Sequence, residues 1–428
     1  MQVTHLDHWG FDPNFPSSGL HCASLFGVVE IVAALIAMEC CDINEGGLVG
    51  YTPLAWAAWN GNEGVVEFLL GQEEISPDKP NDDGQTPLLL AAKNGHEGVV
   101  GMLLTHKGVN PNEPDNGGQT PLSYAAKNGH GGVAKILLRR EEVSSDEPEN
   151  RSRAPLSYAA QYGRRGAVEI LLGRKEVNPN KLDNGGRTPL SYAAQSGYEE
   201  VVKILLNREE VDPDKPDNCL QTPLSYAAWG GHAGVAKILL GWVEVDPERP
   251  NNYGKTPLLY AAWDGREEVV KILLGRDEVN PDRPDCYGVT PLSYAAWRGH
   301  GGVVKILLGR KEVNPDKPDN RGQTPLSYAA QYGHDEVAEI LLGREEVNPN
   351  KPDNSGRTPL SYAAQYGREG VVKILFKREE LIPDRPDNDG QAPLMFAAKH
   401  CHDRVVALLP PYGAETQSAI LSLRDTTP

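Results

Sequence analysis

Residues 324–330 read Thr-Pro-Leu-Ser-Tyr-Ala-Ala, and versions of this stretch return along the chain every 34 residues. The first residue of each copy is Thr52, Thr86, Thr120, Ala154, Thr188, Thr222, Thr256, Thr290, Thr324, Thr358 or Ala392. A fixed period of this length is typical of stacked supersecondary units, which together present an extended surface. We therefore expect function to lie in the residues by which the units differ.

Each unit is predicted to form two short helices and a loop. Thr324 has the pattern of an N-cap, because a proline follows it at the first helical position. Gly333 is expected to end this helix in a left-handed turn, and a second helix is expected from about His334. Residues 346–353 then read as an extended, proline-rich segment. Helices this short are marginal alone in water, so each must pack on its neighbours.

The overall charge is acidic, with a formal net charge of −17 and a pI of about 5.1. This balance argues against binding to nucleic acid or to an anionic membrane, both of which require a basic field. The six cysteines follow no zinc-ligand spacing. Residues 1–18 lack the pattern of a signal peptide, and the apolar stretch 28–38 contains Glu30 and is too short to span a bilayer. We expect an intracellular, cytoplasmic protein, with a nuclear location left open.

The order T-P-L-x-x-A-A, Gly, V-V-x-I-L-L resembles the ankyrin repeat, whereas the W-x2-L-G-x2-Y pattern of the tetratricopeptide repeat is absent. The resemblance covers over nine tenths of the chain and implies an all-α ankyrin-repeat solenoid of about 12 helix-turn-helix units with finger-like turn loops. Ankyrin units have 33 residues, so each unit here has one more. We place the additional residue in the loop Arg344 to Pro352.

The resemblance also sets the expected domain boundaries. Residues 1–17 are a leader or linker, residues 18–409 are the repeat array, and residues 410–428 are a tail. A degenerate first unit spans 13–46, and the other units begin near 47, 81, 115, 149, 183, 217, 251, 285, 319, 353 and 387.

No motif stands out from the repeat as catalytic. Gly254-Lys255-Thr256 is similar to the end of a phosphate-binding loop, but Arg249 occupies the position of its first glycine. The histidines at the start of the second helices lie one per unit, too far apart to share a metal, and are interpreted as structural. His5, His8, His21 and Cys22 have ligand-like spacing, although the repeat explains the last two. We expect no enzymatic activity, no metal and no cofactor.

The positions at which the units differ predict a binding surface. In the ankyrin family, partners usually dock on the concave side, which is formed by the turn tips and the exposed end of the first helix. Three consecutive units place a tryptophan there, and tyrosines and an arginine accompany them. The predicted partner-binding residues are Trp229, Trp263, Trp297, Tyr253, Tyr287, Arg298, Tyr332 and Tyr366. The alternative is that each tryptophan lies flat on its neighbour and fills space.

The expected partner is a protein. Lys93, Lys127, Arg321 and Arg357 make the predicted face less acidic than the molecule as a whole, so an acidic or mixed peptide would suit it. We expect binding of neither nucleic acid nor membrane, and a monomeric state. The repeat sequence E-E-V-N-P-D-K-P-D-N-x-G also resembles that of long ankyrin arrays in fungal proteins. Because many of those follow a nucleotide-binding oligomerisation domain, the chain could alternatively be the recognition arm of such an innate-immune-type receptor.

Three units depart from the repeat at glycine positions. The turn glycine is replaced by Ser152 in the fifth unit and by Leu220 in the seventh, and Cys401 replaces the inter-helix glycine of the last unit. A side chain in a left-handed conformation costs about 1–2 kcal/mol, so we expect the tips at Ser152 and Leu220 to be distorted or more mobile than their glycine-bearing neighbours.

Overall fold

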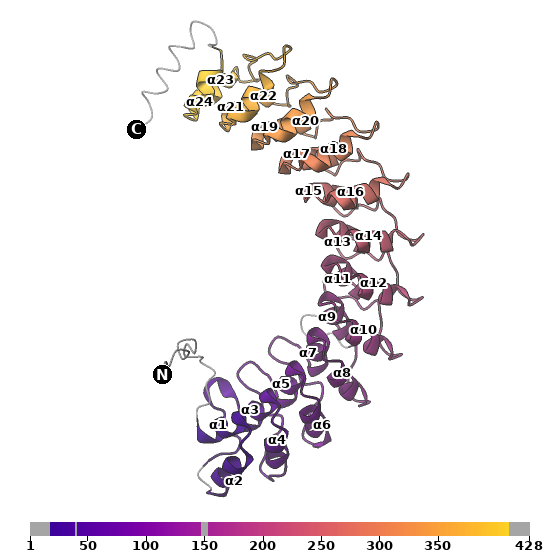
Figure 1. Cartoon of the computed structure of the whole chain (residues 1–428), viewed down its shortest axis with the longest axis vertical. Helices are drawn as coiled ribbons and strands as arrows, with labels where there is room; N and C mark the ends of the chain where they lie inside the picture. Colours follow the sequence, from indigo (N-terminus) through magenta and orange to yellow (C-terminus); the bar gives the residue numbers. More distant parts are fainter. Residues whose placement is uncertain (1–17, 39–40, 147–152, 411–428) are drawn as a thin grey trace, which may run out of the picture. The chain divides into compact units, whose positions relative to one another are not determined.

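The described part of the chain is entirely helical. The structure is a computed structural model that describes residues 18–38, 41–146 and 153–410. Those residues contain helix pairs and connecting turns and no β-strand, which confirms the predicted helix-turn-helix solenoid of about 12 units (Figure 1). The predicted leader and most of the predicted tail lie outside the described residues.

The first helices of the pairs are α1 (Gly19–Phe26), α3 (Pro53–Asn60), α5 (Pro87–Asn94), α7 (Pro121–Asn128), α9 (Pro155–Gln161), α11 (Pro189–Ser196), α13 (Pro223–Gly230), α15 (Pro257–Trp263), α17 (Pro291–Arg298), α19 (Pro325–Tyr332), α21 (Pro359–Gln365) and α23 (Pro393–Lys399). The second helices are α2 (Val29–Ala37), α4 (Glu63–Leu70), α6 (Glu97–Thr105), α8 (Gly131–Leu138), α10 (Arg165–Leu172), α12 (Glu199–Leu206), α14 (Ala233–Leu239), α16 (Glu267–Leu274), α18 (Gly301–Leu308), α20 (Asp335–Leu342), α22 (Glu369–Leu375) and α24 (Asp403–Leu408). One short 3₁₀ helix, η1, spans Leu48–Gly50.

The chain divides into two compact units. Unit 1 ends at Asn218 and contains α1 to α12, and unit 2 begins at Cys219 and contains α13 to α24. Within each unit, consecutive first helices pack side by side in one layer, and consecutive second helices form the other layer (Figure 1). Small residues make this close stacking possible. In the repeat of α19, Leu326, Ala329 and Ala330 are completely buried.

The start of each first helix is fixed by a threonine cap. The Thr324 hydroxyl accepts a hydrogen bond from the backbone N–H of Ser327 (3.2 Å), and Pro325 occupies the first helical position. The two units that carry alanine at this position, Ala154 and Ala392, have no side-chain cap.

Two physical effects explain why glycine occupies the position between the two helices of a repeat. Gly299 takes φ 79°, and a Cβ built there would lie 2.6 Å from Nδ1 of His334 in the next repeat. The residue at the position of His334 therefore occupies the space that a side chain would need. Cys401 takes φ 56° in the last repeat, which has no following repeat among the described residues. At Cys401 the steric constraint from the next repeat is therefore missing, and only the cost of the left-handed backbone conformation remains.

The histidines that begin the second helices connect one repeat to the previous one. Nε2 of His334 donates to the carbonyl oxygen of Trp297 (2.9 Å), and His96, His130, His300 and His402 form the equivalent bond. Where the repeat has arginine instead, as at Arg164 and Arg368, Nε donates to the same carbonyl position. Burial lowers the pKa of His300, so its neutral form is favoured. These contacts support the structural interpretation of the histidines.

An aspartate organises the turn loop in most of the described repeats. Asp319 accepts hydrogen bonds at Oδ1 from the backbone N–H groups of Arg321 and Gln323 (both 2.8 Å), and at Oδ2 from the Tyr328 hydroxyl (2.6 Å). Burial and this bond raise the pKa of Tyr328 far above its ordinary value, so the hydroxyl remains a donor at neutral pH. The same pair occurs as Tyr124–Asp115, Tyr192–Asp183, Tyr294–Asp285 and Tyr362–Asp353.

The loop after the second helix bonds to the next repeat through an asparagine or an aspartate. Nδ2 of Asn44 donates to the carbonyl oxygen of Glu74 (2.7 Å), and its Oδ1 accepts from the N–H of Ser76 (2.7 Å). Asp78 occupies the equivalent position one repeat later. Its Oδ2 accepts from the N–H of Asn110 (2.6 Å), whereas its buried Oδ1 has no hydrogen-bond partner among the described residues.

We expect the substitution Asp78→Asn to stabilise the protein by about 1 kcal/mol at pH 7, because an amide can donate where the carboxylate cannot. Burial raises the pKa of Asp78, partly opposed by the bond from Asn110. A raised native pKa means that protonation favours the folded state, and this contribution disappears as the pH rises through that pKa. The advantage of the variant should therefore shrink as the pH falls toward 4. Urea titrations of both proteins at several pH values measure it, and a gain that grows on acidification would contradict the assignment.

Leu220 keeps the turn geometry of the glycine that it replaces. Its φ is 61°, compared with 84° for Gly322 in a repeat with the usual sequence. The bond between neighbouring tips is retained, because Asn252 N–H donates to the Cys219 carbonyl oxygen (3.0 Å). Leu220 therefore stays in the left-handed region, although at a smaller φ. Ser152 lies outside the described residues.

The strain at Leu220 should be released by Leu220→Gly, which we expect to stabilise the protein by about 0.5–1 kcal/mol, after the entropy cost of a more flexible unfolded chain. Leu182 is the matched control, since it is also exposed but has no positive φ. Leu182→Gly should destabilise by a similar amount. Thermal denaturation of the two variants compares them directly, and equal losses at both positions would show that the left-handed leucine is unstrained.

Candidate partner-binding surface

The turn loop and the end of the first helix share one side of each repeat. Nη1 of Arg357, just before Thr358, donates to Oε1 of Gln365 at the end of α21 (3.3 Å). Gln323 and Gln331 form the same contact one repeat earlier (3.3 Å). We call this side, made of the turn tips, the residue before each repeat threonine and the two residues before each inter-helix glycine, the front face.

The three predicted tryptophans pack along the front face of unit 2. Each indole lies against the tyrosine of the following repeat. The ring centroids are 6.0 Å apart for Trp229 and Tyr260, 4.7 Å for Trp263 and Tyr294, and 5.3 Å for Trp297 and Tyr328. The predicted register is therefore present in the structure.

The tryptophans differ in how much surface they present. Trp229 is 43 % exposed, whereas Trp263 and Trp297 are half-buried and pack on a cluster that includes Val289 and Tyr294. Their two rings also contact each other edge to face at 5.2 Å. Trp263 and Trp297 thus fill space between repeats, as the alternative interpretation required, and still contribute part of their rings to the surface.

The tyrosines are the more accessible members of the set. Tyr253 and Tyr287 at the turn tips are 54 % and 59 % exposed. Tyr332 lies 5.7 Å from Trp297, and both Tyr332 and Tyr366 are exposed. We refer to Trp229, Trp263, Trp297, Tyr253, Tyr287, Tyr332 and Tyr366 as the aromatic row.

Two cations are placed over the aromatic row. The Arg298 guanidinium lies 5.6 Å from the Trp263 ring centre, and Nζ of Lys255 lies 4.7 Å from Trp263 and 4.9 Å from Tyr294. Arg298 is among the residues predicted from the sequence. Lys255 is a further member of this surface that the sequence pattern did not single out, although its position just before Thr256 is a front-face position.

The histidines considered as metal ligands either form structural bonds or lie outside the described residues. No group of three or more His, Cys, Asp or Glu side chains among them could hold a metal ion. His21 is fully used inside its repeat, because Nδ1 contacts the Ser18 hydroxyl (2.6 Å) and Nε2 contacts the Glu45 carbonyl oxygen (3.0 Å). His5 and His8 lie outside the described residues. None of the helices seen in the described ranges has the length and apolar character needed to cross a bilayer.

Comparison with known families identifies the repeat. A family model described as ankyrin repeats (3 copies) matches residues 3–81, 73–146, 142–217, 209–285, 277–353 and 345–419. Since these matches cover nearly the whole chain, the protein belongs to the ankyrin repeat family. Ankyrin repeats generally form non-catalytic scaffolds for protein–protein interaction, so this chain has the architecture of such a scaffold. A search of curated proteins found no match to the chain.

Proposed function

We propose that the protein is a non-catalytic scaffold that binds a partner protein on its front face, which is the concave side in solenoids of this family. The main contact lies on the aromatic row, in the seventh to ninth repeats. In this proposal the protein acts as a monomer inside the cell, uses no cofactor and binds neither nucleic acid nor membrane.

The observation that carries this proposal is the exposure of aromatic side chains in register. Trp229, Tyr253 and Tyr287 each leave a large part of the side chain in water, although nothing in the fold requires an aromatic residue at those positions. Tryptophan, tyrosine and arginine dominate the residues whose truncation weakens protein interfaces most, typically by about 2 kcal/mol or more. Rigid rings with few rotatable bonds also lose little entropy when a partner covers them.

The half-buried rings prepare the same surface. Trp263 packs on Tyr294 and Trp297 packs on Tyr328, so a partner would meet a preformed surface rather than mobile side chains. Lys255 and Arg298 lie over the Trp263 ring and leave their charges available to a carboxylate of the partner.

Affinity capture from extracts of the cells that make the protein tests the proposal. The variant should be Trp229→Ala/Tyr253→Ala/Tyr287→Ala, because these three rings are exposed and their loss leaves the core intact. The matched control is Trp242→Ala/Phe376→Ala, which removes two exposed rings at the ends of second helices. We expect the front-face variant to lose its partners by at least about tenfold and the control to retain them. A folded front-face variant that captures every partner as well as the control would refute the proposal.

The alternative function is that of the recognition arm of a nucleotide-driven innate-immune-type receptor. The resemblance of the repeat sequence to long fungal ankyrin arrays favours this alternative. A continuous coding sequence that joins this array to a G-x4-G-K-[ST] loop preceding it would establish that reading. Genomic and transcript sequencing across the region before Met1 tests it, and a transcript without such a loop would count against it.

A further inference from the structure

The front face of unit 1 carries a series of cations without the row of tryptophans that accompanies the cations of unit 2. Lys93, Lys127, Arg153 and Arg187 lie in four consecutive repeats, one in each. Nη1 of Arg153 donates to Oε1 of Gln161 (2.8 Å), so the position before the repeat threonine adjoins the position two before the glycine. We call these four residues the basic row.

Each cation of the basic row lies over a tyrosine ring of the fold. Nζ of Lys93 and Nζ of Lys127 lie 5.3 Å and 5.7 Å from the centre of Tyr124, and Arg153 and Arg187 lie 4.5 Å and 4.6 Å from that of Tyr192. Such stacking orients a cation and still leaves its charge available to a second partner. The rings therefore favour particular positions for these cations on the front face.

Most of these charges have no carboxylate partner. Asp183 lies 3.4 Å from Arg187 and partly neutralises it. In the described parts of the chain, no ion pair involves Lys93, Lys127 or Arg153. Three cations without an ion pair therefore occur in consecutive repeats of a protein whose net charge is −17.

We propose that the basic row binds an extended acidic segment of a partner protein that carries a carboxylate at every third residue. Stacked helices lie about 10 Å apart. A segment in the extended polyproline II conformation has three residues per turn and advances about 3.1 Å per residue, so every third side chain faces the same way and three residues span about one repeat. Each carboxylate then meets one cation of the basic row.

The surroundings favour a peptide over a nucleic acid. Asp82 and Asp83 lie at the turn tip of the same repeat as Lys93, and Asp115 and Asp183 lie within the array. Closely spaced phosphates would meet these acidic groups, whereas a segment with one charge per repeat meets only the cations. This proposal concerns residues other than the aromatic row, so either can fail without the other.

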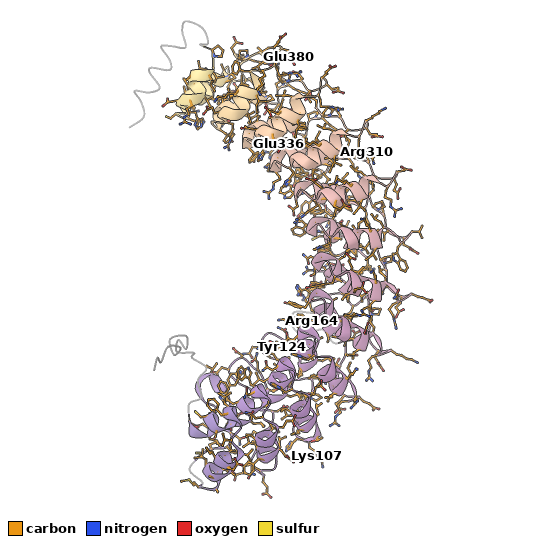
Figure 2. All side chains as sticks on the ribbon, viewed as in Figure 1. Lys107, Tyr124, Arg164, Arg310, Glu336 and Glu380 are labelled. Atoms are coloured by element: carbon orange, nitrogen blue, oxygen red, sulfur yellow. The ribbon has the colours of Figure 1, made fainter. Side chains whose placement is uncertain are left out.

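Fluorescence anisotropy with two dye-labelled peptides tests the proposal on the full chain. Both peptides have fifteen residues with five glutamates, placed at every third position in one and contiguously in the other, with glycine and serine elsewhere. Single-stranded DNA of fifteen nucleotides is the third probe. The variant is Lys93→Gln/Lys127→Gln/Arg153→Gln. The control is Lys107→Gln/Lys135→Gln/Arg139→Gln, which removes three exposed cations in or just after the second helices α6 and α8. Figure 2 shows Lys107 on the side of its repeat away from Tyr124.

We expect the spaced peptide to bind about tenfold more tightly than the contiguous one, and to weaken as salt screens the charges. The basic-row variant should lose about tenfold in affinity for the spaced peptide, and the control less than about twofold. Equal affinities for the two peptides, tighter binding of the DNA, or equal losses in variant and control would each overturn the proposal. Circular dichroism of both variants separates binding from folding, because a purely structural row would lower stability without this dependence on glutamate spacing.

Discussion

Replacing Gly299 by alanine is expected to destabilise the protein by about 2–3 kcal/mol, the larger part of it local to α17 and α18. The left-handed conformation alone costs a side chain about 1–2 kcal/mol. In addition, the new Cβ would lie 2.6 Å from Nδ1 of His334, so the imidazole must move and lose its bond to the Trp297 carbonyl oxygen. A lost hydrogen bond at a half-buried site adds about 1 kcal/mol.

The control for this prediction is Gly101→Ala. Gly101 lies inside α6, and a Cβ built there meets nothing within 4 Å. This variant should be more stable than the parent by about 0.5–1 kcal/mol, since alanine favours the helix. Urea denaturation followed by circular dichroism measures both changes, and hydrogen exchange in α17 and α18 localises the first. Equal stabilities of the two variants would show that the contact between Gly299 and His334 is unimportant.

Asp319→Ala should have a comparable effect, with an expected loss of about 3 kcal/mol. The substitution removes acceptors from two backbone N–H groups and from the Tyr328 hydroxyl, which is buried. Each bond contributes about 1 kcal/mol, and the buried hydroxyl is left without its partner.

The chain itself provides the control substitution for Asp319. Asn251 holds the equivalent position in its repeat, where Oδ1 accepts from the N–H groups of Tyr253 and Lys255 and Nδ2 donates to the Tyr260 hydroxyl (2.8 Å). Asp319→Asn should therefore retain most of the stability. Thermal unfolding of the two variants compares them, and an asparagine variant as unstable as the alanine variant would show that the carboxylate charge, rather than the bonding pattern, organises the loop.

The sequence predicts the fold well because each signal is local. The Thr-Pro start and the glycine end of a first helix follow from capping rules that involve only a few neighbouring residues. The predicted second helix from about His334 is α20, which spans Asp335–Leu342. The fixed period then places every equivalent residue, so the alignment of the three tryptophans follows from their spacing in the sequence.

The contacts that depend on the next repeat are harder to predict. The half-burial of Trp263 and Trp297 results from Tyr294 and Tyr328, which lie 31 residues further along the chain in each case. The roles of Lys255 and Arg153 also require knowing which ring lies beneath each cation. Periodicity gives the register of such residues but not the direction of their side chains, and that direction decides whether a residue packs or binds.

Hydroxyl-radical footprinting of the array with and without a captured partner tests the central claim most directly, because tryptophan and tyrosine are the reactive side chains and are themselves the predicted contacts. We expect the partner to reduce the oxidation of Trp229, Tyr253 and Tyr287 severalfold. Trp242 serves as an internal reference, since it is exposed just after α14, away from the front face. Unchanged oxidation of the three front-face residues, with protection at Trp242 or elsewhere along the second helices, would contradict the account.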